Sequence, residues 1–600
     1  MRAMENSRGN WFKDLFLIFV SGLVLYLGFA FFRPLANPDE GRYAEIPREM
    51  IASGDYITPR LNGLPYFYKP PLFYWMQCAS MKAMGYNRFS IRFASSLTAV
   101  LGICMTYAAA RALYGRRAGW FSAFVLATSI LYYVIGLIVT LDMAVSVFMA
   151  GAMFSFIVAV KKSGIFRSVL FAAFFVFMAL AVMTKGIIGI LIPCAVAFLY
   201  VVSGGISSVM SFFKNIAARD WLFVLLGILA FFAITIPWHV LVSIANPATA
   251  GAEGVFSKNP DGQGFFWYYF IHEHLLRYID PETSMRAQPF WFFLAIAPAG
   301  AIPWIFFLPR IIKNTISGGS VDARGCRNDF LYMAIWICFI VAFFSLSSSK
   351  LVPYITAIYP AFAFVVGVWG AKAWENRAKL NISVENTMLG ISGIVGAVAL
   401  VVAFFILKKK PIDDAVIAAG WYTVFITAAI LLIVSIFAMR YARRDNAKFW
   451  RVAAFGLVVL ILSINLNAGL GQRMNSERVA EYILKNRHGE KVAVAFDYGY
   501  FQDLPVWLDE LPALLGEPPT EQYFGWMREK SAHADRIFPD AAALKAELEK
   551  SGKMWVVVNG RHSLAFGNFG LPLDKRILFE NKHVKLFEIS LENAAKSGTK

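Results

Sequence analysis

The chain has 600 residues, of which 58% are hydrophobic and only 16% are charged, and its net charge is +18. Together with a mean hydropathy of +0.56, this composition excludes an ordinary soluble protein and predicts a polytopic membrane protein. Residues 472–600 hold 18 basic and 18 acidic residues, so the whole positive surplus lies in residues 1–471. A polar C-terminal part without a basic excess argues against nucleic-acid binding.

Apolar stretches recur along the first 470 residues, and most are long enough to cross the hydrocarbon core of a bilayer. The first stretch is too long for a cleaved signal peptide and lacks a small-residue cleavage site, so we expect it to be retained as a helix. In chain order we predict about thirteen membrane-spanning helices, at residues 12–32, 90–110, 118–139, 142–160, 168–184, 187–203, 221–243, 289–309, 329–346, 352–371, 386–407, 415–439 and 449–468.

Arginine and lysine clusters occupy alternate connections between these spans, for example at residues 111–117, 310–327 and 440–448. The positive-inside rule assigns these connections to the cytoplasm. The N-terminus is then inside, and an odd number of spans places the C-terminal part outside. Three consecutive lysines at 408–410 fall on the outer side and depart from the pattern.

After Gly471 the composition changes to that of a small α/β domain of about 130 residues. We expect helices at residues 477–487 and 541–550 and strands at 491–496, 554–558 and 583–589. The predicted division is a membrane domain at 1–470, with outer loops at 33–88 and 244–288, and an outer domain at 471–600. The five cysteines fall mostly in apolar runs without CxxC spacing, which predicts neither a disulfide framework nor a zinc knuckle.

Residues 37–45, directly after the first span, hold three carboxylates and an arginine. Asn37 as a helix cap, followed by proline and two acids, would explain them as a capped surface helix. On the same helix, however, Asp39, Arg42 and Tyr43 would share one face, which is typical of a binding site. Further on, prolines fix an extended backbone beside Lys69, and a rigidly held lysine at headgroup level is a good phosphate ligand.

Four further polar features lie at the outer ends of predicted spans. Asp142 could cap its helix and Lys185 could extend to the interface, or both could face the same cavity as Asp39. In the outer loop, His272 and His274 would point to opposite faces of a helix, which argues against a two-histidine metal site. His274, Arg277 and Tyr278 would share a face suited to an anion, although interfacial packing explains them equally well. Lys350 and Tyr354 lie at the mouth of a later span.

These residues resemble the GT-C membrane glycosyltransferases, and in particular the lipid A aminoarabinose transferases (ArnT), relatives of the protein O-mannosyltransferases. The match is collinear over roughly residues 10–370. It rests on six motifs: Asp39-Glu40-Gly41-Arg42-Tyr43-Ala44-Glu45, Lys69-Pro70-Pro71-Leu72, Leu141-Asp142-Met143, Thr184-Lys185-Gly186, Glu273-His274-Leu275-Leu276-Arg277-Tyr278, and Ser349-Lys350-Leu351 with Tyr354.

The resemblance implies an α-helical membrane protein that takes a sugar from a polyprenyl-phosphate donor and transfers it on the periplasmic face of the bacterial inner membrane, to a lipid A phosphate in the family. It implies Asp39 and Asp142 as catalytic carboxylates, and Lys69, Arg277 and Tyr354 as ligands of the donor phosphate. The full set of expected substrate-binding residues is Glu40, Arg42, Tyr43, Arg60, Lys69, Lys185, His274, Arg277, Lys350 and Tyr354.

One position departs from the family, which carries a glutamate directly before the lysine of Lys-Pro-Pro, where this chain has Tyr68. The missing carboxylate weakens the expectation of aminoarabinose as the sugar and of a divalent metal, and we expect a monomeric enzyme with a metal-independent, inverting transfer. Two alternatives stay open: an enzyme of this fold acting on protein or another glycan, and a transporter or flippase for a lipid-linked sugar. A transporter would place its charges near the bilayer midplane, whereas here they crowd the outer loops.

Overall fold

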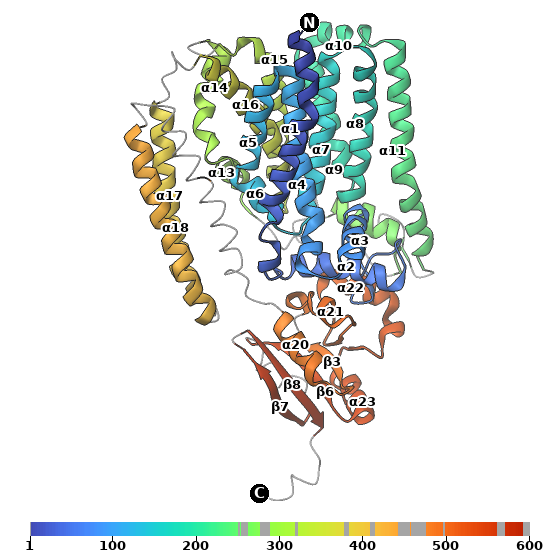
Figure 1. Ribbon diagram of the computed structural model, residues 1–600. Helices are drawn as coiled ribbons and strands as arrows, with labels where there is room; N and C mark the ends of the chain where they lie inside the picture. The colour runs from blue at the N-terminus through green and yellow to red at the C-terminus, as the bar shows by residue number, and fades with distance from the viewer. Residues whose placement is uncertain are drawn as a thin grey trace, which may run out of the picture.

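The structure is a computed structural model that describes residues 2–249, 252–253, 262–276, 288–318, 322–376, 383–408, 414–441, 457, 476–495, 498–560, 570–581 and 583–591. A bundle of long helices carries a small sheet domain at one end (Figure 1). The N-terminus lies at the opposite end of the bundle (Figure 1).

In the described part of the chain, nine helices are long and apolar enough to cross a membrane, or up to eleven if two bent helix pairs each count as one span. The nine include α1 (Arg2–Leu27), α4 (Arg88–Tyr114), α7 (Leu141–Lys161), α8 (Gly164–Lys185), α11 (Ala218–Ala245), α15 (Arg327–Leu346), α16 (Tyr359–Glu375), α17 (Ser383–Lys408) and α18 (Asp414–Tyr441). Helix α7 is the central one, since 94% of its most apolar stretch is buried.

The first twelve predicted spans each coincide with one of these helices, with a bent pair, or with the shorter apolar helix α9 (Ile188–Ser203). The thirteenth, at residues 449–468, lies outside the described residues. The two bent pairs are α5 (Arg116–Ala127) with α6 (Ile130–Leu137), and α13 (Phe292–Gly300) with η4 (Trp304–Phe307) and α14 (Leu308–Ile316).

The predicted spans at 118–139 and 289–309 are therefore bent rather than continuous helices. The first pair is bent by 64°. At that break the Ser129 N–H donates to the Leu126 carbonyl, and the Ser129 hydroxyl donates instead to the Val125 carbonyl at 2.8 Å, which replaces the backbone bond lost there. The second pair is bent by 95°. Pro303 follows its first helix and has no N–H to continue the ladder.

Helices α2 (Asp39–Ser53) and α3 (Leu72–Met84) lie between the bundle and the sheet domain (Figure 1). The chain between them forms the short antiparallel strands β1 (Arg60–Leu61) and β2 (Leu64–Pro65). The capping role expected for Asn37 is wrong. Helix α2 begins at Asp39 after Pro38, and no side chain caps it. Asn37 Nδ2 instead donates to Asp503 Oδ1 of the sheet domain, at 2.5 Å, so α2 is part of a domain contact rather than a surface helix.

The sheet domain contains six strands in the order β5-β4-β3-β6-β8-β7. Strands β3 (Lys491–Ala495), β4 (Ala513–Leu515), β5 (Ile537–Phe538) and β6 (Met554–Asn559) are parallel, while β8 (Val584–Leu591) runs antiparallel to β6 and β7 (Leu573–Glu580). The parallel register pairs Val492 with Trp555. The helices are α20 (Glu477–Asn486), α21 (Leu504–Leu508), α22 (Thr520–Glu529) and α23 (Ala541–Ser551).

The predicted helices at 477–487 and 541–550 and strands at 491–496, 554–558 and 583–589 correspond to α20, α23, β3, β6 and β8. Strands β4, β5 and β7 and helices α21 and α22 were not foreseen. One hydrophobic core joins this domain to the outer loop, because Leu61 and Tyr66 pack in the same cluster as Val494 and Trp526. The sheet domain is therefore fixed against the bundle.

Candidate active site

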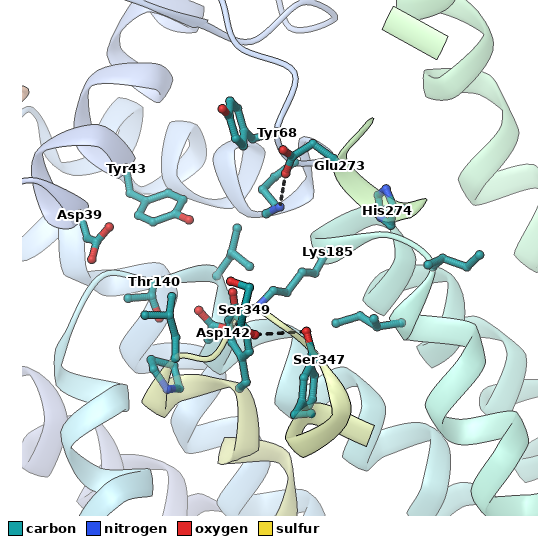
Figure 2. A pocket seen from close by; sticks show the side chains of 18 of the residues that line it. Asp39, Tyr43, Tyr68, Thr140, Asp142, Lys185, Glu273, His274, Ser347 and Ser349 are labelled. Carbon is teal, nitrogen blue, oxygen red and sulfur yellow. Dashed lines mark hydrogen bonds and ion pairs between the residues drawn. The ribbon is translucent and has the colours of Figure 1, made fainter. Parts of the chain in front are cut away.

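A cavity of about 500 Å³ lies where the ends of α7 and α8 meet α2, the segment around Lys69 and helix α22 of the sheet domain. Figure 2 shows side chains from both the bundle and the outer loops pointing into it. The polar residues that line it are Asp39, Arg42, Tyr43, Tyr66, Tyr68, Lys69, Thr140, Asp142, Lys185, Glu273, His274, Ser347, Ser349, Tyr354 and Glu521.

Asp142 and Lys185 form an ion pair in this cavity (Figure 2). Asp142 lies in the first turn of α7 and Lys185 is the last residue of α8. Each charge lies at the helix end whose dipole favours it. The Lys185 ammonium also lies 4.3 Å from the centre of the Tyr354 ring. The two residues thus face one cavity, as one of the two sequence-based alternatives predicts.

The turn after Lys185 depends on Gly186, which has a φ of +84°. A Cβ atom at this position would collide with Nε2 of His274 and the hydroxyl of Tyr269. His274 Nδ1 lies 2.6 Å from the carbonyl oxygen of Tyr269, so Nδ1 carries the proton. Burial lowers the pKa of His274, which leaves a neutral imidazole in the cavity wall.

Arg42 joins two carboxylates at the end of the cavity nearest the sheet domain. Its guanidinium lies 3.9 Å from Asp39 on the same helix and 2.6 Å from Glu521 on α22. Arg42 Nε also donates to Gln502 Oε1 of the sheet domain, at 3.3 Å. The Arg42 side chain is only 9% exposed, whereas that of Asp39 is 57% exposed. Asp39 is therefore the more accessible carboxylate.

Lys69 lies 3.6 Å from Glu273, whose side chain is 2% exposed. Glu273 belongs to a π-helix, η2 (Trp267–Leu276), where the sequence predicts an ordinary helix at 270–278. Tyr68 stacks on Tyr66 with ring centres 4.9 Å apart, next to the lysine. The expected phosphate ligand Arg277 lies outside the described residues, as does Tyr278.

Three expected substrate-binding residues do not line the cavity. Glu40 is 1% exposed and accepts two hydrogen bonds from Arg92, at 3.0 and 2.6 Å. Arg60 forms an ion pair with Glu529 of the sheet domain at 2.7 Å. Lys350 is buried and its ammonium donates to the Ser347 carbonyl at 2.5 Å. These charges hold the outer loops together, so the structure gives them a structural role.

The cavity also contains residues that the sequence analysis did not select. Glu273 is the first residue of the motif Glu273-His274-Leu275-Leu276-Arg277-Tyr278, and its position beside His274 could have identified it as a candidate site residue. Tyr66, Tyr68, Thr140, Ser347 and Ser349 lie within a few residues of selected positions. Glu521 had no signal, because its contact with Arg42 is set by the packing of the sheet domain. In the described part of the chain, no three His, Cys, Asp or Glu side chains form a group that could hold a metal ion, and metal independence stays a prediction.

The chain is similar in sequence to known membrane transferases. The family described as dolichyl-phosphate-mannose-protein mannosyltransferase matches residues 68–238. The undecaprenyl phosphate-alpha-4-amino-4-deoxy-L-arabinose arabinosyl transferase 2 of Sodalis glossinidius is 31% identical over 385 residues, which are 64% of this chain and 64% of that protein, just under two thirds of its length. The corresponding transferase of Enterobacter sp. (strain 638) is 28% identical over 461 residues, 73% of this chain and 75% of that protein.

A solved structure extends the similarity to almost the whole chain. The crystal structure of ArnT from Cupriavidus metallidurans bound to undecaprenyl phosphate superposes with a TM-score of 0.77 at 25% identity, and covers 96% of this chain and 98% of that one. A similarity of this extent includes the bundle, the outer loops and the sheet domain. The two chains share one fold.

Proposed function

We propose that this chain, an ArnT-like membrane protein with the GT-C fold, transfers a sugar from an undecaprenyl-phosphate donor to an acceptor at the outer membrane face. The observation that carries this proposal is the meeting of Asp39, Asp142, Lys69, Lys185 and Tyr354 in one cavity. They come from five separate segments, and loops that were merely polar would not bring them together.

The charges suit the departure of a polyprenyl phosphate from a sugar. Glycosyl transfer passes through an oxocarbenium-like state, which negative charge near the ring stabilises. Asp39 is the exposed carboxylate that can approach the ring or the acceptor. Lys69 and Lys185 are the cations of the described cavity wall, beside Arg42, and positive charge stabilises the leaving phosphate.

The curated relatives are named as transferases of 4-amino-4-deoxy-L-arabinose from undecaprenyl phosphate, and we propose an amino-pentose as the sugar and a lipid A phosphate as the acceptor. A phosphate acceptor is already an anion at neutral pH and needs no general base, so Asp39 then acts on the sugar rather than on the acceptor. A hydroxyl acceptor would need Asp39 as general base.

The proposed orientation places the cavity in the periplasm of a bacterium and the N-terminus in the cytoplasm. Arg111 and Arg116 both pair with Asp14 of α1, so this basic cluster lies toward the N-terminal end of the bundle. The sheet domain lies at the other end of the bundle (Figure 1), and its residue Glu521 lines the cavity. The positive-inside rule assigns the basic end to the cytoplasm.

A second candidate keeps the chemistry and changes the acceptor. The family match at residues 68–238 is to protein mannosyltransferases, and this favours a serine or threonine hydroxyl of a protein. The two candidates differ in where the sugar is found, on lipid A or on protein.

Mass spectrometry of lipid A from cells with and without the chain tests the proposal. We expect a mass increment of one amino-pentose that depends on the chain and disappears with Asp39→Asn or Lys69→Ala at normal expression. The matched control is Glu375→Gln, an exposed residue that pairs with Arg117 far from the cavity, and it should leave the increment unchanged. Unimpaired transfer by both cavity variants would refute the assignment.

A further inference from the structure

Glu521 is the one charged residue that the sheet domain contributes to the described cavity wall. Its helix α22 is held in place by contacts that the residues directly after Glu521 make with the loops of the membrane domain. Gln522 Nε2 donates to the carbonyl of Leu61 at 2.6 Å, and the ring of Phe524 stacks on Tyr268 at 4.3 Å. The position of the Glu521 carboxylate is therefore fixed by packing between the two domains.

The cavity is not uniform in charge. Among the described lining residues, Asp142 is paired with Lys185, and Glu273 lies beside Lys69. At the end nearest the sheet domain, two carboxylates, Asp39 and Glu521, share the single guanidinium of Arg42. That end carries an excess of negative charge, and both acids are accessible, with side chains 57% and 30% exposed. It suits a cationic group of the substrate better than a phosphate.

We propose that Glu521 determines specificity for an amino sugar: with Asp39 it binds the ammonium group of the transferred sugar at the sheet-domain end of the cavity. This inference rests on the proposed glycosyl transfer and specifies its sugar. An ammonium has three donors and no acceptor, and charge-assisted bonds to carboxylates are the strong way to satisfy it. Phosphate and amine of the donor would then lie toward opposite ends of the cavity.

Tyr68 lies next to the same cluster of charges. Its ring stacks on that of Tyr66, with ring centres 4.9 Å apart. The guanidinium carbon of Arg42 lies 6.0 Å from the centre of the Tyr66 ring, so the tyrosines adjoin the Asp39–Arg42–Glu521 cluster. Through Glu521 of α22, the sheet domain becomes part of the site.

The test measures kcat/KM of the purified full-length chain with two synthetic donors, undecaprenyl phosphate bearing 4-amino-4-deoxy-L-arabinose and its N-formyl derivative, with lipid A as acceptor. The wild type should prefer the charged amine. Glu521→Gln should lose roughly 10-fold or more in kcat/KM for the amine donor, because a site built to bind a polar group loses its discrimination when that contact is removed. Its kcat/KM for the neutral donor should stay within about 3-fold.

Glu521→Asp should restore part of the preference, since it returns a carboxylate. Glu517→Gln, an exposed residue shortly before α22 that does not line the cavity, is the matched control and should behave as the wild type with both donors. Equal loss for both donors would mean that Glu521 only supports Arg42, and no loss would mean that it does not touch the sugar; either result overturns the inference. A wild type that transfers neither sugar would instead overturn the proposed function, on which the inference rests.

Discussion

Lys185 at the end of α8 and Asp142 at the start of α7 form an ion pair in the cavity, although 43 residues separate them along the chain. Two adjacent antiparallel helices bring these ends together. Both side chains are largely withdrawn from solvent, at 12% and 14% exposed. The pair therefore lies in a setting of reduced dielectric, where each charge depends on the other.

Lys185→Met should reduce transfer by roughly 100-fold or more, because it removes a preorganised cation beside the leaving phosphate. The measurement is the initial rate of the purified variant at matched protein concentration. The double variant Asp142→Asn/Lys185→Met removes both charges and should recover thermal stability but not activity. Recovery of activity in the double variant would show that Lys185 serves the fold alone.

Gly186→Ala should abolish most transfer, because a methyl group there collides with His274 and Tyr269 and the residue has a φ of +84°. The matched control is Gly164→Ala at the other end of the same helix, where φ is +73° and no atom lies within 4 Å of the added Cβ. Both variants carry a left-handed backbone cost of about 1–3 kcal/mol. The measurements are the transfer rate and the thermal unfolding temperature of each variant. The two variants should lose stability, but only Gly186→Ala should also lose most of its transfer rate under conditions where it is still folded.

The sequence predicts the helical part of this fold well because membrane spans are local signals. A stretch of about 20 apolar residues identifies itself without knowledge of its neighbours. The sequence did not predict strands β4 and β5, because they contain only three and two residues. Such short segments carry no period, and the pairing of β4 with β3 and of β5 with β4 is decided by the tertiary packing.

The candidate site shows the same division. Asp39, Lys69, Asp142 and Lys185 stand out because each is a charge at the edge of an apolar stretch, and all four line the cavity. Glu40 does not line the cavity, because it is paired with Arg92, which lies 52 residues away. Arg60 does not line it either, and its partner Glu529 belongs to the sheet domain. The sequence shows where the charged residues are, but it does not show which of them form ion pairs in the folded protein.

Glu40→Gln should lower the free energy of unfolding by about 3–5 kcal/mol, because it leaves the guanidinium of Arg92 buried without its counter-charge. The side chains of this pair are 2% and 0% exposed. Glu375→Gln breaks an ion pair whose side chains are 58% and 65% exposed and should change stability by less than about 1 kcal/mol. Denaturation in detergent compares the two. Similar losses in both would contradict the structural role assigned to Glu40.

Glu45 and Glu49 are buried together on α2, where Arg48 donates to Glu45 at 2.8 and 2.7 Å. Burial raises the pKa of Glu49 above its ordinary value of 4.5, and the pKa of Glu45 is raised as well. A carboxyl with a raised folded-state pKa binds its proton more tightly when folded. Its contribution to stability is fully present below about pH 4.5 and is lost as pH rises through the folded-state pKa.

Glu49→Gln should therefore stabilise the chain increasingly as pH rises, because the amide needs no proton and can still accept the hydrogen bond that Glu49 receives from the Gly63 N–H at 2.8 Å. We expect unfolding temperatures close to the wild type near pH 5 and higher than the wild type near pH 9. Thermal unfolding of the detergent-solubilised protein across this range measures the difference. The difference in unfolding temperature could instead be constant with pH, or it could favour the wild type at alkaline pH. Either result would mean that Glu49 is ionised in the folded protein and that Arg48 neutralises both carboxylates.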